Sequence, residues 1–391
     1  MRIVDVNGFY TPRGGGVKTY VQRKLAAAPM LGHDVIILAP GDGDSDVRVN
    51  EFARIVTLDN PAFPLDRRYH YFGDEAALHR ALERLQPDVV ECSSPWTSPN
   101  MVARWGGAAV RSLVMHCDPL AAYPYRWFGG IMDRASIDRG FDWFWRHLRR
   151  LDSRYDIVIS ASPSLSSRLT GGGMTRVVTE PMGVEPHIFS ADLRDDSLRA
   201  DLLARCGLQP DATLLVGVGR FSPEKRWPMV IEAVIAAGYN RPVGLVLIGT
   251  GRDRGRMDKA AAGSPHIQTI APIMDRQKLA ALLASGDALI HGGDENETFC
   301  MVAAEARASG LPLIVPNVGG AADQADRGIG RTYRAGDAAD LARAITAFLD
   351  EDPAAQLAAA RARAPTVRTM DDHFRNLFGR YAALLEQRAA A

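Results

Sequence analysis

Short runs of apolar, often β-branched residues alternate with amphipathic segments along almost the whole chain. Five runs in the first half predict strands, at residues 2–7, 34–40, 87–94, 112–117 and 156–162. Five more follow in the second half, at residues 213–220, 242–251, 267–272, 287–293 and 311–317. Strands that alternate with amphipathic helices are typical of βαβ units and of a mainly parallel sheet. The pattern therefore predicts an α/β protein.

A polar segment at residues 185–197 separates the two series of predicted strands. It lacks strand periodicity and follows a cluster of proline and glycine, which is typical of a linker. We therefore predict two Rossmann-like domains, residues 1–186 and 187–370, with a helix at 371–391 that packs back on the first. Ligands of such sheets bind at the carboxyl ends of the strands, so domains that face each other would enclose a central cleft.

The composition argues against several classes of protein. Lysine and arginine number 46, as do aspartate and glutamate, so the zero net charge gives no indication of nucleic-acid binding. The four cysteines form no CxxC pair, which argues against a structural zinc site and favours a reducing compartment. No signal peptide and no run of eighteen apolar residues is evident. We therefore expect a cytoplasmic protein.

Three consecutive glycines at residues 14–16 follow the first predicted strand and lead into a helix. Glycine lets a backbone approach a phosphate closely, and the helix amino terminus adds positive potential. Gly15 and Gly16 are therefore candidates for phosphate contact, although a flexible turn would use the same residues. The GKS or GKT ending of a P-loop is missing.

His116 and Asp118 follow the fourth predicted strand, at the carboxyl edge of its sheet. A histidine in this position can orient a sugar hydroxyl or help to deliver an acceptor nucleophile. The alternative is a histidine with a structural role, which is the commoner case for a lone residue. The position at a strand end favours the functional interpretation.

In the second half, Arg220 follows a predicted strand and Lys225 enters the next helix. Two cations at such a junction can bind a diphosphate and stabilise it as a leaving group, although surface ion pairs have the same pattern. Gly249 lies in a GxGxxxG spacing, but no acidic residue ends a suitable following strand, which argues against a dinucleotide site. Gly249 is predicted instead to shape a turn against the ligand.

An acidic cluster in the segment 291–316 lies between a predicted strand and an apolar helix. If the helix begins near Thr298, Glu297 lies at its amino terminus and Glu305 roughly 12 Å further along its axis. Two carboxylates so placed can bind hydroxyl groups at opposite ends of an extended ligand. The alternative is that Glu297 caps the helix and Glu305 is exposed. The amides expected to face a phosphate between the carboxylates are those of Phe299, Cys300 and Met301.

These residues resemble a motif of the family-4 retaining glycosyltransferases, which have the GT-B fold. The run ETFCMVAAE, residues 297–305, is similar to the E-x7-E motif of that family. The similarity continues through GGGVKTYV, VMHCDP, PMGVEPHIF, VGRFSPEKRW, LIGTG and EARASGLPLI. Because these segments cover nearly the whole chain in the right order, the resemblance is more specific than any single motif.

The resemblance implies a role for each matching residue. Arg220 and Lys225 would neutralise the diphosphate of a nucleotide-sugar donor. Gly15 and Gly16 would approach that diphosphate from the amino-terminal domain. His116 would contact the transferred sugar near its reacting carbon.

The two glutamates of the motif would bind the remaining parts of the donor. Glu297 would hold hydroxyl groups of the sugar, and Glu305 would hold the ribose. Enzymes of this family are similar in needing no metal or other cofactor, since the cations and a helix amino terminus replace it. The resemblance also implies retention at the anomeric carbon, by attack on the face from which the nucleotide leaves. No protein nucleophile is then required.

The chain departs from the family pattern at several positions. Thr298 and Cys300 replace two glycines of the usual E-G-F-G run, and Cys300 carries a side chain where the glycine lets the backbone approach the sugar phosphate. His291 and Gly292 stand where proline and serine are frequent. These changes leave the reaction class intact but weaken any inference about the nucleotide and the sugar.

The segment 123–151 is dense in aromatic residues and arginine. A helix from about Ser136 would present an apolar stripe to the core and a second, basic stripe to solvent. The basic stripe consists of Arg139, Trp143, Arg146 and Arg150. Such a stripe suits contact with an anionic membrane, as a lipid-linked acceptor would require, and the alternative is a solvated basic face. Candidates for the acceptor groove are Asp118, Tyr123, Tyr125 and Trp127.

We therefore predict a retaining hexosyltransferase that uses a UDP- or GDP-sugar and a hydroxyl acceptor, which is a glycan, a lipid or a lipid-linked glycan. A lipid acceptor would place it on the inner face of the membrane. One alternative is a GT-B epimerase acting on the nucleotide sugar, which would need further acid and base carboxylates. A second is a non-catalytic nucleotide-sugar-binding protein, against which the intact set of candidate residues argues.

Overall fold

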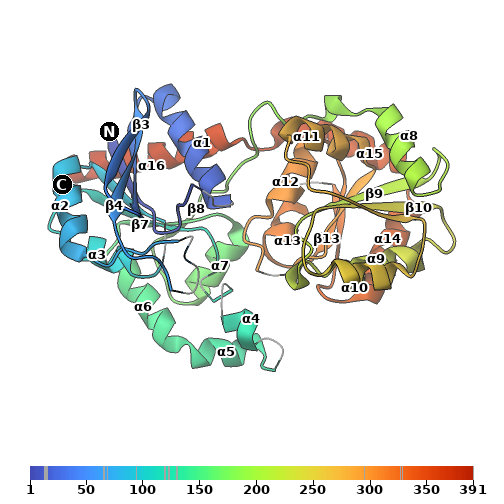
Figure 1. The fold of residues 1–391 in the computed structure, drawn as a ribbon, viewed down its shortest axis with the longest axis horizontal. Coiled ribbons are helices and arrows are strands. Elements are labelled where there is room, and N and C mark those ends of the chain that lie inside the picture. Colours follow the sequence, from blue (N-terminus) through green and yellow to red (C-terminus); the bar gives the residue numbers. More distant parts are fainter. Residues whose placement is uncertain are drawn as a thin grey trace. The chain divides into compact units, whose positions relative to one another are not determined.

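The computed structural model describes residues 1–12, 16–64, 67, 69–93, 95–118, 120–121, 124–128, 131–294, 296–325, 327 and 329–390. The chain forms two compact units (Figure 1). The first consists of Met1–Pro181 with Met370–Ala391, and the second of Met182–Thr369. The chain therefore passes from one unit to the other twice. The first passage lies a few residues before the boundary that we expected.

The first unit is built on an eight-stranded sheet with the order β3-β4-β2-β1-β5-β6-β7-β8. Neighbouring strands run parallel, except for the antiparallel pair β3 and β4 at one edge. Its strands are β1 (Arg2–Val6), β2 (Asp34–Gly41), β3 (Ser45–Asn50), β4 (Ala53–Asp59), β5 (Val89–Cys92), β6 (Val110–Met115), β7 (Ile157–Ser160) and β8 (Val177–Thr179). Its helices are α1 (Gly16–Leu31), α2 (Glu75–Leu85), α3 (Ser98–Arg104), α4 (Pro124–Phe128), α5 (Arg134–Gly140), α6 (Asp142–Asp152), α7 (Pro163–Gly171) and α16 (Met370–Ala390).

The carboxyl-terminal helix α16 packs against α1 and β6 of the first unit (Figure 1). Buried polar side chains fix this arrangement. The Tyr381 hydroxyl of α16 donates to Glu91 of β5 at 2.7 Å and lies 2.9 Å from Ser112 of β6. Glu91 also contacts Lys24 of α1, which donates to Asp5 of β1 at 3.0 Å. The fully buried ammonium thus joins α1 to two strands.

The second unit is built on a six-stranded parallel sheet with the order β11-β10-β9-β12-β13-β14. Its strands are β9 (Thr213–Val218), β10 (Val243–Ile248), β11 (Ile267–Ile270), β12 (Ala288–Ile290), β13 (Leu313–Pro316) and β14 (Gly330–Tyr333). Its α-helices are α8 (Asp196–Arg205), α9 (Trp227–Ala237), α10 (Arg254–Ala261), α11 (Arg276–Ser285), α12 (Met301–Ala308), α13 (Gly319–Ala325), α14 (Ala338–Asp350) and α15 (Pro353–Arg363). Short 3-10 helices lie at Ala191–Leu193, Pro223–Lys225 and Ala364–Thr366.

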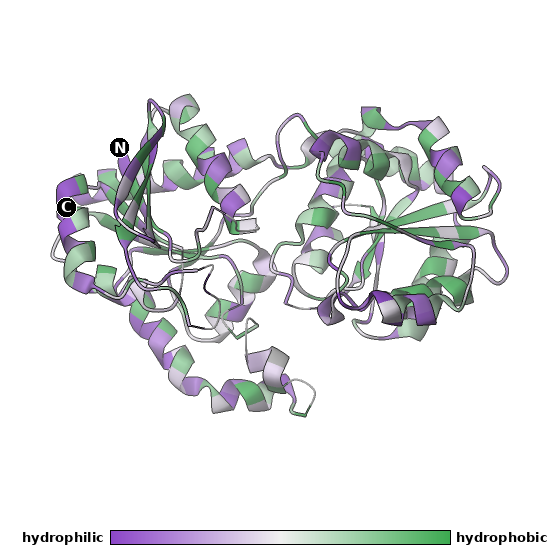
Figure 2. Cartoon of the chain, in the orientation of Figure 1, coloured by the Kyte–Doolittle hydropathy of each residue, from purple (hydrophilic) through white to green (hydrophobic). Residues whose placement is uncertain are grey.

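Apolar residues are concentrated on the strands, whereas the helices carry both hydrophobic and hydrophilic residues (Figure 2). The central strands β9 and β10 are buried along nearly their whole length. This burial is expected for parallel strands whose two faces are both covered by helices. No helix of the described ranges is long and apolar enough to cross a lipid bilayer.

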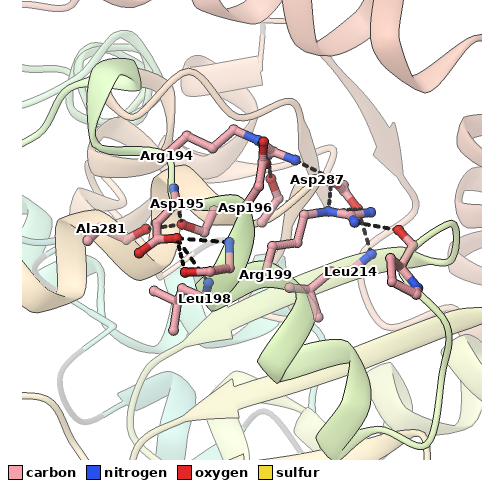
Figure 3. Close-up of polar contacts among 12 residues, drawn as sticks. Arg194, Asp195, Asp196, Leu198, Arg199, Leu214, Ala281 and Asp287 are labelled. Carbon is pink, nitrogen blue, oxygen red and sulfur yellow. Dashed lines mark hydrogen bonds and ion pairs between the residues drawn. The ribbon is translucent and has the colours of Figure 1, made fainter.

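A polar cluster fixes α8 to the amino ends of strands β9 and β12 (Figure 3). Asp287, which directly precedes β12, accepts hydrogen bonds from Arg199 of α8 at 2.7 Å and from the Leu214 amide of β9 at 2.8 Å. Arg199 also donates to the Ala212 carbonyl at 2.7 Å. The cluster lies at the opposite ends of the strands from the loops where α/β proteins bind ligands, so its role is structural.

All ten predicted strands are present, and the fold class is confirmed. The apolar runs of the sequence do not predict β3, β4, β8 and β14. The edge strand β3 is almost wholly exposed, so it lacks an apolar run, and β8 is only three residues long. The helix expected from Ser136 is wrong in its continuity, because α5 ends at Gly140 and α6 begins at Asp142.

Candidate active site

The loops after β9 and β12 bring a cation and a carboxylate together in the second unit. Lys225 ends the 3-10 helix that follows β9, and Glu297 lies in the segment between β12 and α12. Their side chains form an ion pair and are 14% and 24% exposed, so solvent screens it only partly. Because β9 and β12 are neighbours in a parallel sheet, their carboxyl ends deliver both residues to the same edge. Burial lowers the pKa of the Lys225 ammonium.

Arg220 is more exposed than Lys225 and pairs with Glu224 at 2.9 Å. Its backbone carbonyl accepts a hydrogen bond from the Trp227 indole at 2.9 Å, which fixes the loop after β9. The loop after β10 packs closely against this loop. A Cβ atom on Gly249 would lie only 1.9 Å from the carbonyl oxygen of Gly219. Gly249 is thus required for the close approach of two backbones.

The helix that follows Glu297 begins later than the sequence suggested. Helix α12 begins at Met301, and its N-cap is Cys300. Cys300 has a left-handed backbone (φ 59°, ψ 69°), which explains why glycine is usual here in the family that the sequence resembles. The expectation of a helix from Thr298 is therefore wrong. Phe299 and Cys300 are buried, and Met301 is 37% exposed.

Glu305 is buried within α12, which contradicts the alternative of an exposed residue. Its carboxylate contacts the guanidinium of Arg276, at the start of α11. Arg276 also pairs with Glu185 at 3.1 Å and stacks over the ring of Phe189 at 4.9 Å. Burial raises the pKa of Glu305, and Arg276 opposes this shift. Arg276 is not among the predicted site residues, although, like Lys225, it is a cation between a strand and a helix, here β11 and α11.

His291 lies directly after β12, and its side chain has no exposed surface. The ring meets Trp227 edge-on at 6.3 Å between centroids, and its Nε2 atom lies 3.7 Å from a carboxylate oxygen of Glu297. The backbone carbonyl of His291 accepts a hydrogen bond from the Tyr333 hydroxyl at 2.8 Å. Burial and the charge of Lys225 hold the pKa of His291 well below its usual value. Its ring is therefore neutral at physiological pH.

In the first unit, His116 directly follows β6, as predicted. The ring of Tyr20, on α1, packs edge-on against it at 4.9 Å between centroids. The Tyr20 hydroxyl in turn bonds to Nε2 of His373 on α16 at 2.9 Å. Burial lowers the pKa of His116 to about 4, while the charge of Asp5 opposes this shift. The imidazole is therefore neutral and can accept a hydrogen bond from a hydroxyl group.

Two acceptor candidates belong to a polar cluster around Arg168, on α7. Arg168 pairs with Asp118 at 3.0 Å and with Asp138 of α5 at 2.6 Å. The Tyr125 hydroxyl donates to Asp138 at 2.6 Å. The polar atoms of Asp118 and Tyr125 thus serve to hold the loop after β6 against α5 and α7. Arg168 and Asp138 are not among the predicted site residues, because neither lies near a recognisable motif in the sequence.

The remaining candidates are less constrained. Trp127 is 62% exposed and its ring contacts Phe128. Gly16 is the first residue of α1, and a Cβ atom there would meet nothing within 4 Å. Gly15 and Tyr123 lie outside the described residues, so their roles stay predictions.

Two family models match the chain, one in each half. The chain matches the family described as Glycosyltransferase Family 4 over residues 14–188, and Glycosyl transferases group 1 over residues 202–364. It is 31% identical over 319 residues to a GDP-mannose-dependent alpha-(1-6)-phosphatidylinositol dimannoside mannosyltransferase of Mycobacterium tuberculosis, covering 81% of this chain and 79% of that protein. It is 28% identical over 340 residues to a GDP-mannose-dependent alpha-mannosyltransferase of Mycolicibacterium smegmatis, covering 83% and 81%.

A solved structure, the sucrose-phosphate synthase from Thermosynechococcus elongatus, matches the whole of both chains with a TM-score of 0.77 and 18% identity. At that identity the likeness shows the fold alone. The two Rossmann-like units and the matches together define a glycosyltransferase of the GT-B class. The chain belongs to glycosyltransferase family 4, as its motifs predicted.

Proposed function

We propose that this enzyme transfers a hexose of the mannose type from a GDP-sugar to a hydroxyl group of a lipid or lipid-linked acceptor. The observation that carries the proposal is the pairing of Lys225 with Glu297 at the carboxyl ends of β9 and β12. It supplies a cation for a diphosphate and a carboxylate for sugar hydroxyls within one site. The choice of nucleotide follows the relatives, both of which are named as GDP-mannose-dependent.

The proposed reaction retains the anomeric configuration and needs no metal. The bond between the anomeric carbon and the diphosphate oxygen breaks, and the acceptor oxygen bonds to that carbon on the same face. The proton of the acceptor hydroxyl passes to the departing diphosphate. Arg220 and Lys225 would stabilise the negative charge that develops on the diphosphate. Electrostatic stabilisation of this kind makes the largest contribution to the rate enhancement of many enzymes.

The other residues would position the donor. Glu305 would bind the ribose hydroxyls, and its pairing with Arg276 favours the charged carboxylate, in opposition to the burial that raises its pKa. His116, being neutral, would accept a hydrogen bond from a hydroxyl of the transferred sugar without adding a positive charge beside the reacting carbon.

The acceptor proposal rests on the surface of α4 to α6. Trp143 is 53% exposed and Ile131 82% exposed, and the exposed Arg146 and Arg150 follow Trp143 along α6. Exposed tryptophan beside arginine suits the interface of an anionic membrane. The name of the M. tuberculosis relative includes a phosphatidylinositol glycolipid, which is consistent with an acceptor at such a surface.

Thermal unfolding in the presence of EDTA tests the donor assignment. GDP and GDP-mannose should raise the melting temperature, because a ligand that binds the folded state stabilises it by mass action. UDP-glucose and ADP-glucose serve as matched comparisons and should have much smaller effects. A shift with UDP-glucose alone would refute the choice of GDP, and no shift with any nucleotide would contradict the donor site.

A further inference from the structure

Three side chains with different donor atoms converge in the segment before α12. One of them is Glu297, whose carboxylate we assign to the sugar hydroxyls. The ligand atoms of His291, Glu297 and Cys300 all lie within 4.8 Å of one another. The imidazole comes from the end of β12, and the thiol from the N-cap of α12, so a single loop connects them. Two of the three, His291 and Cys300, are among the positions at which the sequence departs from the family pattern.

The His291 ring is fully buried, and within the described ranges neither of its nitrogens has a hydrogen-bond partner. Its Nε2 atom faces Glu297 at 3.7 Å, beyond hydrogen-bond distance. Leaving a buried polar atom without a partner is unfavourable, because the atom loses its hydrogen bonds to water. A ligand between the imidazole and the carboxylate would give the Nε2 atom of His291 a partner.

Cys300 is buried and adopts a left-handed backbone conformation. For a residue other than glycine this backbone conformation is strained. Glycine would occupy the position without that strain, yet the chain keeps a thiol there. The thiol of Cys300, whose backbone is strained, and the unpartnered imidazole of His291 both lie beside Glu297. This arrangement indicates a site for one ligand.

We propose that His291, Glu297 and Cys300 form a binding site for a thiophilic divalent cation of the Zn²⁺ type, and that this cation inhibits the enzyme. Nitrogen, oxygen and sulfur donors are those that zinc prefers, and three protein ligands leave a fourth position for water. On binding, the thiol would release its proton to solvent as the sulfur–metal bond forms. The carboxylate and thiolate then balance the charge of the cation.

A charged group beside this site is the ammonium of Lys225, which contacts Glu297. A cation would displace this ammonium from the carboxylate, and it would occupy the carboxylate that we assign to the sugar. Cation and donor should therefore compete. This step rests on the proposed function, whereas cation binding itself does not.

Cobalt provides a direct probe of the site, because a thiolate ligand gives Co²⁺ a charge-transfer band in the near ultraviolet. The metal-free full-length protein is titrated with Co²⁺, and Zn²⁺ is then added as a competitor. The variants are Cys300→Ser and His291→Gln. The matched control is Cys117→Ser, which removes a partly exposed thiol of the first unit. Thermal melting shows whether each variant is folded.

We expect one equivalent of Co²⁺ to give the band in the wild type and in Cys117→Ser. Cys300→Ser should lose the band, and both site variants should bind more than about 100-fold more weakly, since even outer-shell partners contribute about 10- to 100-fold. A band that persists in folded Cys300→Ser, or its absence from the wild type, would overturn the site.

Inhibition is measured separately. Zn²⁺ should reduce wild-type turnover competitively with the donor, whereas the residual turnover of Cys300→Ser, whatever its level, should no longer depend on Zn²⁺. Non-competitive or absent inhibition would overturn the inhibitory role. Failure of the proposed function can be distinguished from these outcomes, because the wild type would then transfer no sugar in EDTA.

Discussion

Lys225 and Glu297 lie 72 positions apart in the sequence, yet the ammonium group of one contacts the carboxylate of the other. The sheet order explains the contact, because β12 pairs directly with β9 and not with the intervening strands β10 and β11. The loops after these two strands are therefore neighbours. A cation and a carboxylate that are distant in the sequence therefore form a single site.

Lys225→Ala should weaken the binding of GDP and of GDP-mannose. A charge-assisted hydrogen bond contributes about 1.5–3 kcal/mol, so we expect the dissociation constant to rise by about 10- to 100-fold. Calorimetry measures the change, and Lys259→Ala, an exposed lysine on α10, is the control. Equal affinities for the two variants would show that Lys225 is a structural partner of Glu297 and does not bind the diphosphate.

Gly249→Ala should destabilise the second unit, because the added Cβ atom would overlap the carbonyl oxygen of Gly219 at 1.9 Å. Overpacking of this kind costs about 1–3 kcal/mol of unfolding free energy. Gly255→Ala on α10 is a matched control, since a Cβ atom there meets nothing within 4 Å. In a helix this control should gain up to about 1 kcal/mol. Denaturant unfolding compares the two, and similar stabilities would contradict the packing.

The pKa of His116 near 4 predicts how activity depends on pH. The imidazole should stay neutral from pH 5.5 to 8, so kcat/KM should show no inflection near 6.5 that belongs to this residue. In the unfolded chain His116 binds a proton below about pH 6.5, whereas in the folded protein it does so only below about pH 4. His116 therefore costs no unfolding free energy above pH 6.5, and the unfolding free energy declines as the pH falls from there toward 4. An inflection near 6.5 that disappears in His116→Asn would contradict a neutral role.

The double variant Trp143→Ala and Arg146→Ala should bind less to vesicles that contain anionic lipid. A basic residue near such a surface contributes about 1 kcal/mol, and the tryptophan adds apolar contact, so the partition coefficient should fall by about tenfold. Co-sedimentation measures it, with Tyr239→Ala and Arg252→Ala on the second unit as the exposed control pair. Equal binding of both pairs would place membrane contact elsewhere or exclude it.

Much of the fold could be predicted because buried parallel strands are continuous apolar runs between polar helices. Strands such as β9 and β10 therefore stand out, whereas the exposed β3 and the short β8 do not. The break at Phe141 was missed because the apolar stripe continues across it, and only Gly140 at the end of α5 signals the interruption.

The candidate site was predictable where local rules apply. His116 and Lys225 follow strands, so the position of each could be inferred from its neighbours in sequence. The ion pair between Glu305 and Arg276 could not, because it depends on how α12 packs beside α11. The start of α12 was also missed, because no sequence rule predicts a non-glycine residue in the left-handed conformation of Cys300.

Transfer of labelled mannose from GDP-mannose to a bacterial lipid extract, measured in EDTA, is the decisive measurement for the proposed role of Glu297. We expect a labelled lipid product with the wild type and with Glu232→Gln, an exposed glutamate of α9. Glu297→Gln should keep its melting temperature but lose at least about 100-fold in turnover, as expected when a group that stabilises the transition state is removed. Full turnover by folded Glu297→Gln would contradict the site.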